Sequence, residues 1–216
     1  TPEGFRLNRS HLHVTGHGIN LSNFTASRQP ATEFLRLVSI GRISRSKGIQ
    51  VILETLPDLP KNGVPYQLLV IGAPLTRDDE RYAKELHAYV EAHNLTSVTF
   101  MGARPAAEIP LLLSRSDVVL HPSTTGSLDK VVLEAMAAGC VVISSNDSAR
   151  PILAKINAHC AVEEPRADLF LRAIKNIYSL GRDGRQDIGE KGRAIVAAEH
   201  ALPQLIERLV CILKNK

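Results

Sequence analysis

The sequence contains few aromatic residues, few cysteines and no long apolar run. Aromatic residues make up 4% of the 216 residues, too few to stack the bases of a single-stranded nucleic acid. The cysteines are three in number and widely spaced, at Cys140, Cys160 and Cys211, so we expect core thiols in place of disulfides or a metal knuckle. No apolar run approaches the roughly 18 residues that span a bilayer, and no charged-then-apolar leader opens the chain. We therefore expect a soluble, unexported, cytoplasmic protein that binds no nucleic acid.

Two common phosphate-binding motifs and a common metal motif are also missing. A Walker loop that begins at Gly41 would need glycine where Ser46 stands, and a dinucleotide fingerprint that begins at Gly16 would need glycine where Leu21 stands. These absences argue against an NTPase and an NAD enzyme. There is no Asp-x-Asp pair either, so we expect neither a metal ion that bridges a diphosphate nor any other cofactor.

Short apolar runs alternate with segments of helical period from residue 34 onward. This alternation is typical of βαβ units and predicts an α/β fold, a Rossmann-like parallel sheet of about six strands flanked by helices. We predict strands over residues 34–40, 67–71, 98–101, 118–120 and 141–143, with a short sixth strand at 159–162. We predict helices from about residue 47, over 76–93, 128–138, 167–180 and 185–214, and two short helices begun by Pro105 and Pro110.

The same pattern divides the chain into three parts. Residues 1–30 lack clear periodicity and are expected to form a linker with a leading strand near His13. Residues 31–180 carry the strand and helix alternation and form the Rossmann-like domain. Residues 181–216 form a helical extension at the carboxyl end.

Basic residues follow the first predicted strand. Ligands of open parallel sheets bind beyond the carboxyl ends of the strands, and Gly41, Arg42 and Lys47 lie there. An arginine and a lysine on one loop supply two positive charges for an anion, and glycine lets a ligand approach the backbone. The pattern indicates a phosphate compound, and a solvated basic loop is the alternative.

The helix after the fourth strand carries a second anion-binding feature. Its amino end, at residues 127–131, offers free backbone N–H groups and the positive end of the helix dipole. Glu134 is the one acid in an apolar stretch, about 8 Å along the helix from its start. That distance is compatible with the separation between the diphosphate and the ribose of one nucleotide, so we predict that Glu134 binds the ribose. A structural glutamate that caps a neighbouring loop is the alternative.

Other polar residues have simpler interpretations. We expect His121 to be a packed or backbone-bonded histidine instead of a catalytic base. Asp78 and Asp79 are expected to begin a helix instead of binding a metal. A cluster of three histidines lacks the spacing of metal ligands on a helix, so we interpret its members as linker histidines: His11, His13 and His17.

Several motifs, taken together and in this order, resemble a known family. They are His17–Asn20 with Phe24, Gly41-Arg42 with Lys47-Gly48, the strand end Phe100–Gly102, the segment 117–123 (DVVLHPS) and the segment 130–139 (KVVLEAMAAG). They are similar to the carboxyl-terminal, donor-binding domain of the retaining GT-B glycosyltransferases of family 4.

The resemblance implies a metal-independent hexosyltransferase that moves a sugar from a UDP- or GDP-sugar to an acceptor hydroxyl with retention. It implies that Arg42 and Lys47 are catalytic cations on the donor diphosphate and that Glu134 binds the ribose. Base-binding would fall to Gly102, Ala103 and Arg104. Contacts to the donor sugar and phosphate would come from Gly126, Ser127, Leu128, Asp129, Lys130 and Val131.

One position departs from the family pattern. The family usually has a second glutamate eight positions before Glu134, where this chain has Gly126, and Asp129 is a candidate substitute. The resemblance also implies an amino-terminal acceptor domain, to which the final helix would cross back. We expect the isolated donor domain to be inactive, and the full-length enzyme could associate peripherally with a membrane.

Two other functions fit the same residues. One is a nucleotide-sugar epimerase on the same scaffold, and the other is a non-catalytic nucleotide-binding domain. The sequence leaves open the base, the sugar, the acceptor and the oligomeric state.

Overall fold

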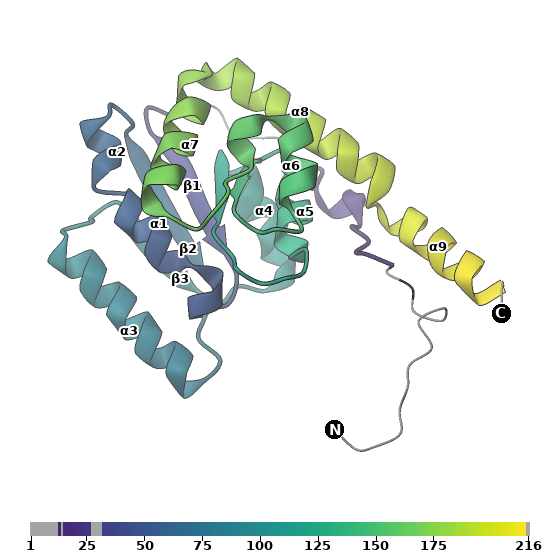
Figure 1. Ribbon diagram of the computed structural model, residues 1–216, viewed down its shortest axis with the longest axis horizontal. Helices are drawn as coiled ribbons and strands as arrows, with labels where there is room; N and C mark the ends of the chain where they lie inside the picture. The colour runs from purple at the N-terminus through teal and green to yellow at the C-terminus, as the bar shows by residue number, and fades with distance from the viewer. Residues whose placement is uncertain (1–12, 14, 27–31, 215–216) are drawn as a thin grey trace.

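The structure, a computed structural model, describes residues 13, 15–26 and 32–214 and contains one parallel sheet (Figure 1). The strand order is β3-β2-β1-β4-β5, and every neighbouring pair is parallel. This confirms the predicted Rossmann-like α/β fold. The strands are β1 (Leu35–Ile40), β2 (Tyr66–Ile71), β3 (Val98–Gly102), β4 (Val118–His121) and β5 (Val141–Ser144), each within one residue of its predicted bounds.

The predicted sixth strand is wrong. Residues Ala158–Cys160 form a 3-10 turn (η5), and the Asn157 side chain caps it by accepting a hydrogen bond from the His159 N–H. Residues 159–162 pair with the sheet through one isolated parallel bridge, between Ser144 and Ala161. The sheet therefore has five strands in the described part of the chain, because the turn takes up the residues that would have extended the pairing.

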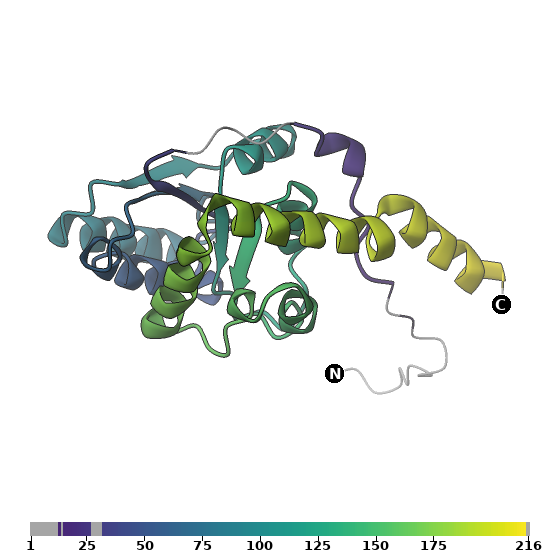
Figure 2. The same cartoon turned by 90° about the horizontal axis from the view of Figure 1, so that it is seen from above.

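Helices cover both faces of the sheet (Figures 1 and 2). On one face of the sheet, α1 packs against α3 and α7. On the opposite face, α5 packs against α8. Right-handed crossovers require this arrangement for the observed strand order. The helices are α1 (Ile49–Thr55), α2 (Asp58–Lys61), α3 (Arg77–Ala92), α4 (Ile109–Ser114), α5 (Lys130–Ala137), α6 (Arg150–Ile156), α7 (Ala167–Ser179), α8 (Gly181–Glu199) and α9 (Leu202–Lys214).

Helix α3 begins as its sequence predicts. The Thr76 hydroxyl accepts a hydrogen bond from the Asp79 N–H, and the Asp79 carboxylate accepts one from the Thr76 N–H. This reciprocal capping box satisfies two of the N–H groups that a helix start leaves unpaired. Asp78 forms an ion pair with Arg81 one turn further on. The expectation that Asp78 and Asp79 begin a helix is confirmed.

The carboxyl-terminal helix predicted over 185–214 is two helices. α8 starts earlier, at Gly181, and ends at Glu199, and α9 starts at Leu202. The break is stabilised by Ile19, which donates a hydrogen bond to the His200 carbonyl and accepts one from the Leu202 N–H. Pro203, in the first turn of α9, suits a helix start and would not suit the interior of one long helix.

Helix α8 packs closely on the domain. A Cβ atom on Gly189 would lie 2.1 Å from the carbonyl oxygen of Gly139, at the end of α5, so glycine permits the approach of the two helices. Ile188 and Val196 are buried on the same helix. By contrast α9 projects away from the sheet (Figures 1 and 2), and its apolar side chains Leu202, Ile206, Leu209, Val210 and Leu213 are exposed.

The cysteines divide between core and surface. Cys140 and Cys160 are buried, and burial raises the pKa of Cys160 to about 12. Cys211 lies on α9 and is exposed, so the expectation of a third core thiol is wrong, because α9 leaves the domain that would have covered it.

The predicted leading strand lies largely outside the described residues. His13 belongs to no strand, and the described part of this segment joins the rest of the protein through the parallel bridge between Ile19 and Ala201. Within residues 13, 15–26 and 32–214, no helix has both the length and the apolar character to cross a membrane.

Candidate functional site

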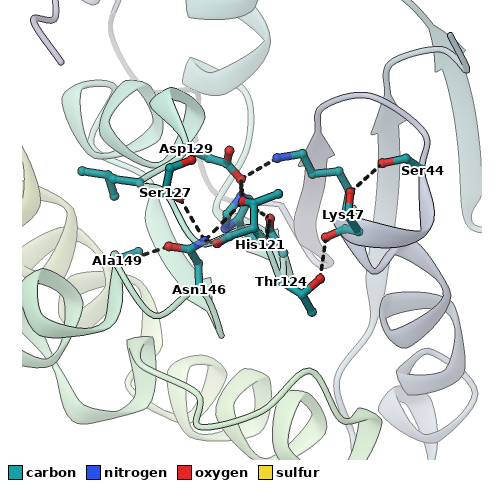
Figure 3. Close-up of polar contacts among 12 residues, drawn as sticks. Ser44, Lys47, His121, Thr124, Ser127, Asp129, Asn146 and Ala149 are labelled. Atoms are coloured by element: carbon teal, nitrogen blue, oxygen red, sulfur yellow. Dashed lines mark hydrogen bonds and ion pairs between the residues drawn. The ribbon is translucent and has the colours of Figure 1, made fainter. Parts of the chain in front are cut away.

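The loops after β1 and β4 meet at the carboxyl edge of the sheet. Residues Arg45–Lys47 form a short 3-10 helix (η3), and the Thr124 N–H donates a hydrogen bond to the Ser46 carbonyl at 2.9 Å. The Thr124 hydroxyl donates to the same carbonyl at 3.3 Å (Figure 3). Gly48 follows with φ of 66° and lies against Pro122, so close that a Cβ atom would be 2.4 Å from the Pro122 carbonyl oxygen. The basic loop and the loop after β4, which leads into α5, are thus fixed against each other.

Lys47 and His121 share one carboxylate oxygen of Asp129. The Lys47 Nζ lies 2.6 Å from Asp129 Oδ2, His121 Nε2 lies 2.8 Å from it, and the Thr125 hydroxyl donates to it at 3.1 Å (Figure 3). Burial raises the pKa of Asp129, but hydrogen bonds from His121, Lys47 and Ser123 outweigh it and hold this pKa well below the usual carboxyl range. Asp129 is therefore ionised at neutral pH, and its carboxylate faces the Lys47 ammonium.

His121 is buried and bonded on both ring nitrogens. The Ser144 hydroxyl donates its proton to the His121 carbonyl at 2.9 Å, so its oxygen accepts from His121 Nδ1–H, also at 2.9 Å. Nε2 faces Asp129. His121 is packed as the sequence predicts, but its ring partners are side chains and not backbone groups. These side chains belong to the cluster around Lys47.

The other two basic residues of the first loop lie toward α3. Arg42 is nearly half exposed, and its Nε lies 3.9 Å from Asp79 Oδ2. Arg45 donates to Glu85 at 2.6 Å and lies 4.8 Å above the Tyr82 ring centroid. The structure therefore brings Lys47 to the start of α5 and holds Arg42 only loosely.

A row of backbone N–H groups leads into α5. In the described structure the N–H groups of residues 126 through 131 have no hydrogen-bond acceptor, and the first bonded one is Val132, which donates to the Asp129 carbonyl at 3.0 Å. Free donors at the positive end of a helix dipole form an anion-binding surface. The row lies beside the Lys47–Asp129 pair because Asp129 is part of it.

Glu134 lies one turn into α5. It is partly buried and pairs with Lys130 at 3.2 Å, within its own helix. Among the described residues no neighbouring loop donates a hydrogen bond to Glu134, so its predicted alternative role as a loop cap is not what the structure contains. Residues 102–104 are exposed at the end of β3, where the Gly102 carbonyl accepts from the Gly72 N–H at 2.9 Å.

A cavity of about 790 Å³ lies away from this cluster. It opens at the amino ends of β1 and β4, beside Arg36 and Asp117, and also borders Arg182 and Arg193. The Arg36 guanidinium contacts both carboxylate oxygens of Asp117, at 2.9 and 2.8 Å. Ligand sites of open parallel sheets lie at the opposite edge, so we place the candidate site at Lys47 and α5 and not in this cavity.

Comparison with known families decides the affiliation. The model of the family described as "Glycosyl transferases group 1" matches residues 23–195, well over half of the chain. The chain belongs to the glycosyl transferases group 1 family. Its motifs at Lys47 and α5 fall inside the matched span.

Curated relatives of this group 1 domain are longer proteins. It is 29% identical over 154 residues to the putative colanic acid biosynthesis glycosyltransferase WcaL of Escherichia coli K12, covering 67% of this chain and 36% of WcaL. It is 35% identical over 178 residues to spore coat protein SA of Bacillus subtilis 168, covering 80% of this chain and 47% of that protein. The chain thus spans half or less of these relatives.

Solved structures share the fold of the group 1 domain. A glycosyltransferase from Rickettsia africae ESF-5 superposes with a TM-score of 0.81 at 19% identity, over 99% of this chain and 60% of that one. Anabaena HepE, solved with UDP and glucose, superposes with a TM-score of 0.76 at 20% identity, over 92% and 55%. The C-terminal domain of Francisella tularensis LpcC gives 0.72 at 23%, over 86% and 100%. These similarities establish a Rossmann-like half of the GT-B type.

Sequence reasoning missed residues that shape the site of this group 1 domain. Asn146, after β5, is buried and donates hydrogen bonds to the carbonyls of Thr125 and Ser127, while Ser148 donates to Gly126 (Figure 3). His17 donates to the Leu128 carbonyl at 2.9 Å, so this linker histidine contacts the loop before α5. A polar side chain two positions after a buried strand was the available signal for Asn146. Among the described residues no group of three or more His, Cys, Asp or Glu side chains is placed to hold a metal ion.

Proposed function

We propose that this chain is the carboxyl-terminal, donor-binding domain of a retaining family 4 glycosyltransferase that uses a UDP- or GDP-sugar. The observation that carries the proposal is the row of unbonded N–H groups at residues 126–131 beside the Lys47 ammonium. A diphosphate needs many donors and a compensating positive charge, and this edge of the sheet offers both. Family membership and the UDP in the HepE structure support the choice of ligand.

The proposed roles follow from the elements that carry each residue. The diphosphate lies on the N–H row, with Lys47 and Arg42 as its cations; Arg42 is loosely held and free to turn from Asp79. Glu134, one turn along α5, accepts hydrogen bonds from the ribose hydroxyls. The exposed residues Gly102, Ala103 and Arg104 face the base.

Catalysis is proposed to depend on charge stabilisation of the leaving group. When the glycosidic bond breaks, negative charge grows on the diphosphate, and preplaced donors stabilise it without reorganising. No metal is required in this proposal, since Lys47, Arg42 and the N–H row supply the positive charge. Asp129 takes the place of the missing glutamate at position 126 by orienting Lys47 and the donor sugar's hydroxyls.

The proposal extends to the full-length enzyme. Residues 31–180 form the donor-binding domain, 181–216 a helical extension and 1–30 a linker to an amino-terminal acceptor domain. Transfer to an acceptor hydroxyl then needs that second domain, and this chain binds the donor without completing transfer. We propose that the full-length enzyme is cytoplasmic and that it can associate peripherally with a membrane.

Calorimetric titration of this chain tests the proposed donor binding. We expect saturable binding of UDP or GDP at or below about 1 mM, which corresponds to about 4 kcal/mol of binding free energy, in buffer that contains EDTA. UMP and GMP serve as matched controls because they keep the base and the ribose and lack the second phosphate. Absence of binding at millimolar nucleotide would favour a non-catalytic domain, and binding that depends on added Mg²⁺ would contradict the metal-independent site.

A further inference from the structure

The loop before α5 is held by hydrogen bonds to its backbone carbonyl oxygens. Four consecutive carbonyls accept hydrogen bonds from side chains of other segments. Asn146 Nδ2 donates to Thr125 O at 2.5 Å and to Ser127 O at 3.1 Å, Ser148 Oγ donates to Gly126 O at 3.0 Å, and His17 Nε2 donates to Leu128 O at 2.9 Å. These side chains come from the β5–α6 loop and from the segment before β1.

The direction of the carbonyls fixes the direction of the amides. The peptide bonds of this loop are trans, so the N–H of each peptide unit points opposite to its carbonyl. Carbonyls 125–128 belong to the same peptide units as the N–H groups of residues 126–129. Because each of the four carbonyls is bonded to a side chain of the protein, the N–H of the same peptide unit points away from that side chain. This accounts for the lack of acceptors for the four N–H groups in the described structure.

Asn146 makes the largest contribution to this arrangement. Its side chain is 1% exposed, and all four of its hydrogen-bonding positions are used. Oδ1 accepts from the N–H groups of Ser148 and Ala149, both at 3.1 Å, and Nδ2 donates to two carbonyls of the loop (Figure 3). Since backbone donors lie on one side and backbone acceptors on the other, the amide has only one satisfactory orientation.

We propose that Asn146, assisted by Ser148, is a positioning residue that turns the N–H groups of residues 126–129 toward the donor diphosphate. This inference rests on the proposed function and deepens it, because it assigns the preorganisation of the anion site to the β5–α6 loop. Asn146 does not touch the ligand. It acts by removing the carbonyl oxygens, which would repel a phosphate, from the surface that binds it.

The Asn146→Asp variant separates the two halves of the side chain. Aspartate keeps the size of asparagine and the acceptor for Ser148 and Ala149, but its ionised carboxylate cannot donate to Thr125 and Ser127. We expect UDP affinity, measured by calorimetry, to fall about tenfold or more, and to fall likewise in Asn146→Leu, a neutral variant of similar size that can donate to neither carbonyl. Ser148→Ala, a neutral variant that removes one of the four carbonyl contacts, is expected to reduce affinity about two- to fivefold.

A readout on the free chain keeps this inference distinct from the proposed function. The amide NMR signals of residues 126–131 are expected to shift and broaden in Asn146→Asp without nucleotide, while signals of α3 stay unchanged. If the unmodified chain fails to bind UDP, the proposed function fails, and the free-chain spectra still decide the positioning role. Unchanged loop signals, or a UDP affinity that falls in Asn146→Asp but not in the neutral Asn146→Leu, would overturn the inference.

Discussion

Replacing Lys47 with alanine in the full-length enzyme is expected to lower turnover by about 100-fold. The Lys47 Nζ lies 2.6 Å from Asp129, beside the N–H row on which the diphosphate is proposed to lie. Loss of one preplaced donor to a developing negative charge commonly costs about 3 kcal/mol of transition-state stabilisation. Arg42→Ala is expected to lower turnover at least about tenfold for the same reason. Steady-state kinetics at saturating donor measure both effects.

A double variant separates the direct loss from an indirect one. Lys47→Ala also leaves the Asp129 carboxylate with one cation fewer in an anion-binding site, and Lys47→Ala with Asp129→Asn removes that negative charge. A partial recovery would assign part of the loss to Asp129. Lys61→Ala, an exposed lysine on α2, is the matched control and is expected to have unaltered kinetics. Wild-type turnover in Lys47→Ala would contradict the assignment of Lys47.

Gly48→Ala is expected to reduce both stability and nucleotide affinity. Gly48 has φ of 66°, and its added Cβ would lie 2.4 Å from the Pro122 carbonyl oxygen. The backbone strain alone costs about 1–2 kcal/mol. Relief of the clash adds to this, because either the basic loop or the loop after β4 must move. We expect urea unfolding to report a loss of about 3 kcal/mol or more, since overpacking adds about 1–3 kcal/mol.

Gly63→Ala is the matched control for that prediction. Gly63 has φ of 71° and no atom within 4 Å of an added Cβ, so it tests the backbone strain without the clash. We expect it to lose about 1–2 kcal/mol of stability and to keep its UDP affinity. Equal losses in the two variants would mean that the contact between Gly48 and Pro122 does not fix the site.

The regular elements of the fold could be predicted because each carried a local signal. The five strands are apolar runs that end at glycine or at a turn. Helix α3 starts at a capping box that Thr76 and Asp79 form. The prediction of a sixth strand was wrong because residues 158–160 form a 3-10 turn, which the Asn157 side chain caps. The division of the final helix was also missed, although Pro203 marked the start of α9.

The site was only partly accessible to the same reasoning. Position after a strand pointed to Arg42 and Lys47, and helix direction pointed to the N–H groups at residues 127–131. The pairing of Lys47 with Asp129 and the contacts of Asn146 depend on how three loops fold against one another. No periodicity or spacing in the sequence encodes the direction of a loop carbonyl, so these contacts could be found only in the three-dimensional structure.

A crystal structure of this chain with UDP tests the central claim most directly. The account predicts a diphosphate within hydrogen-bonding distance of Lys47 and of the N–H groups at residues 127–131, with the ribose hydroxyls on Glu134. A nucleotide bound instead in the cavity beside Arg182 and Arg193, or one whose phosphates contact neither Lys47 nor α5, would contradict it.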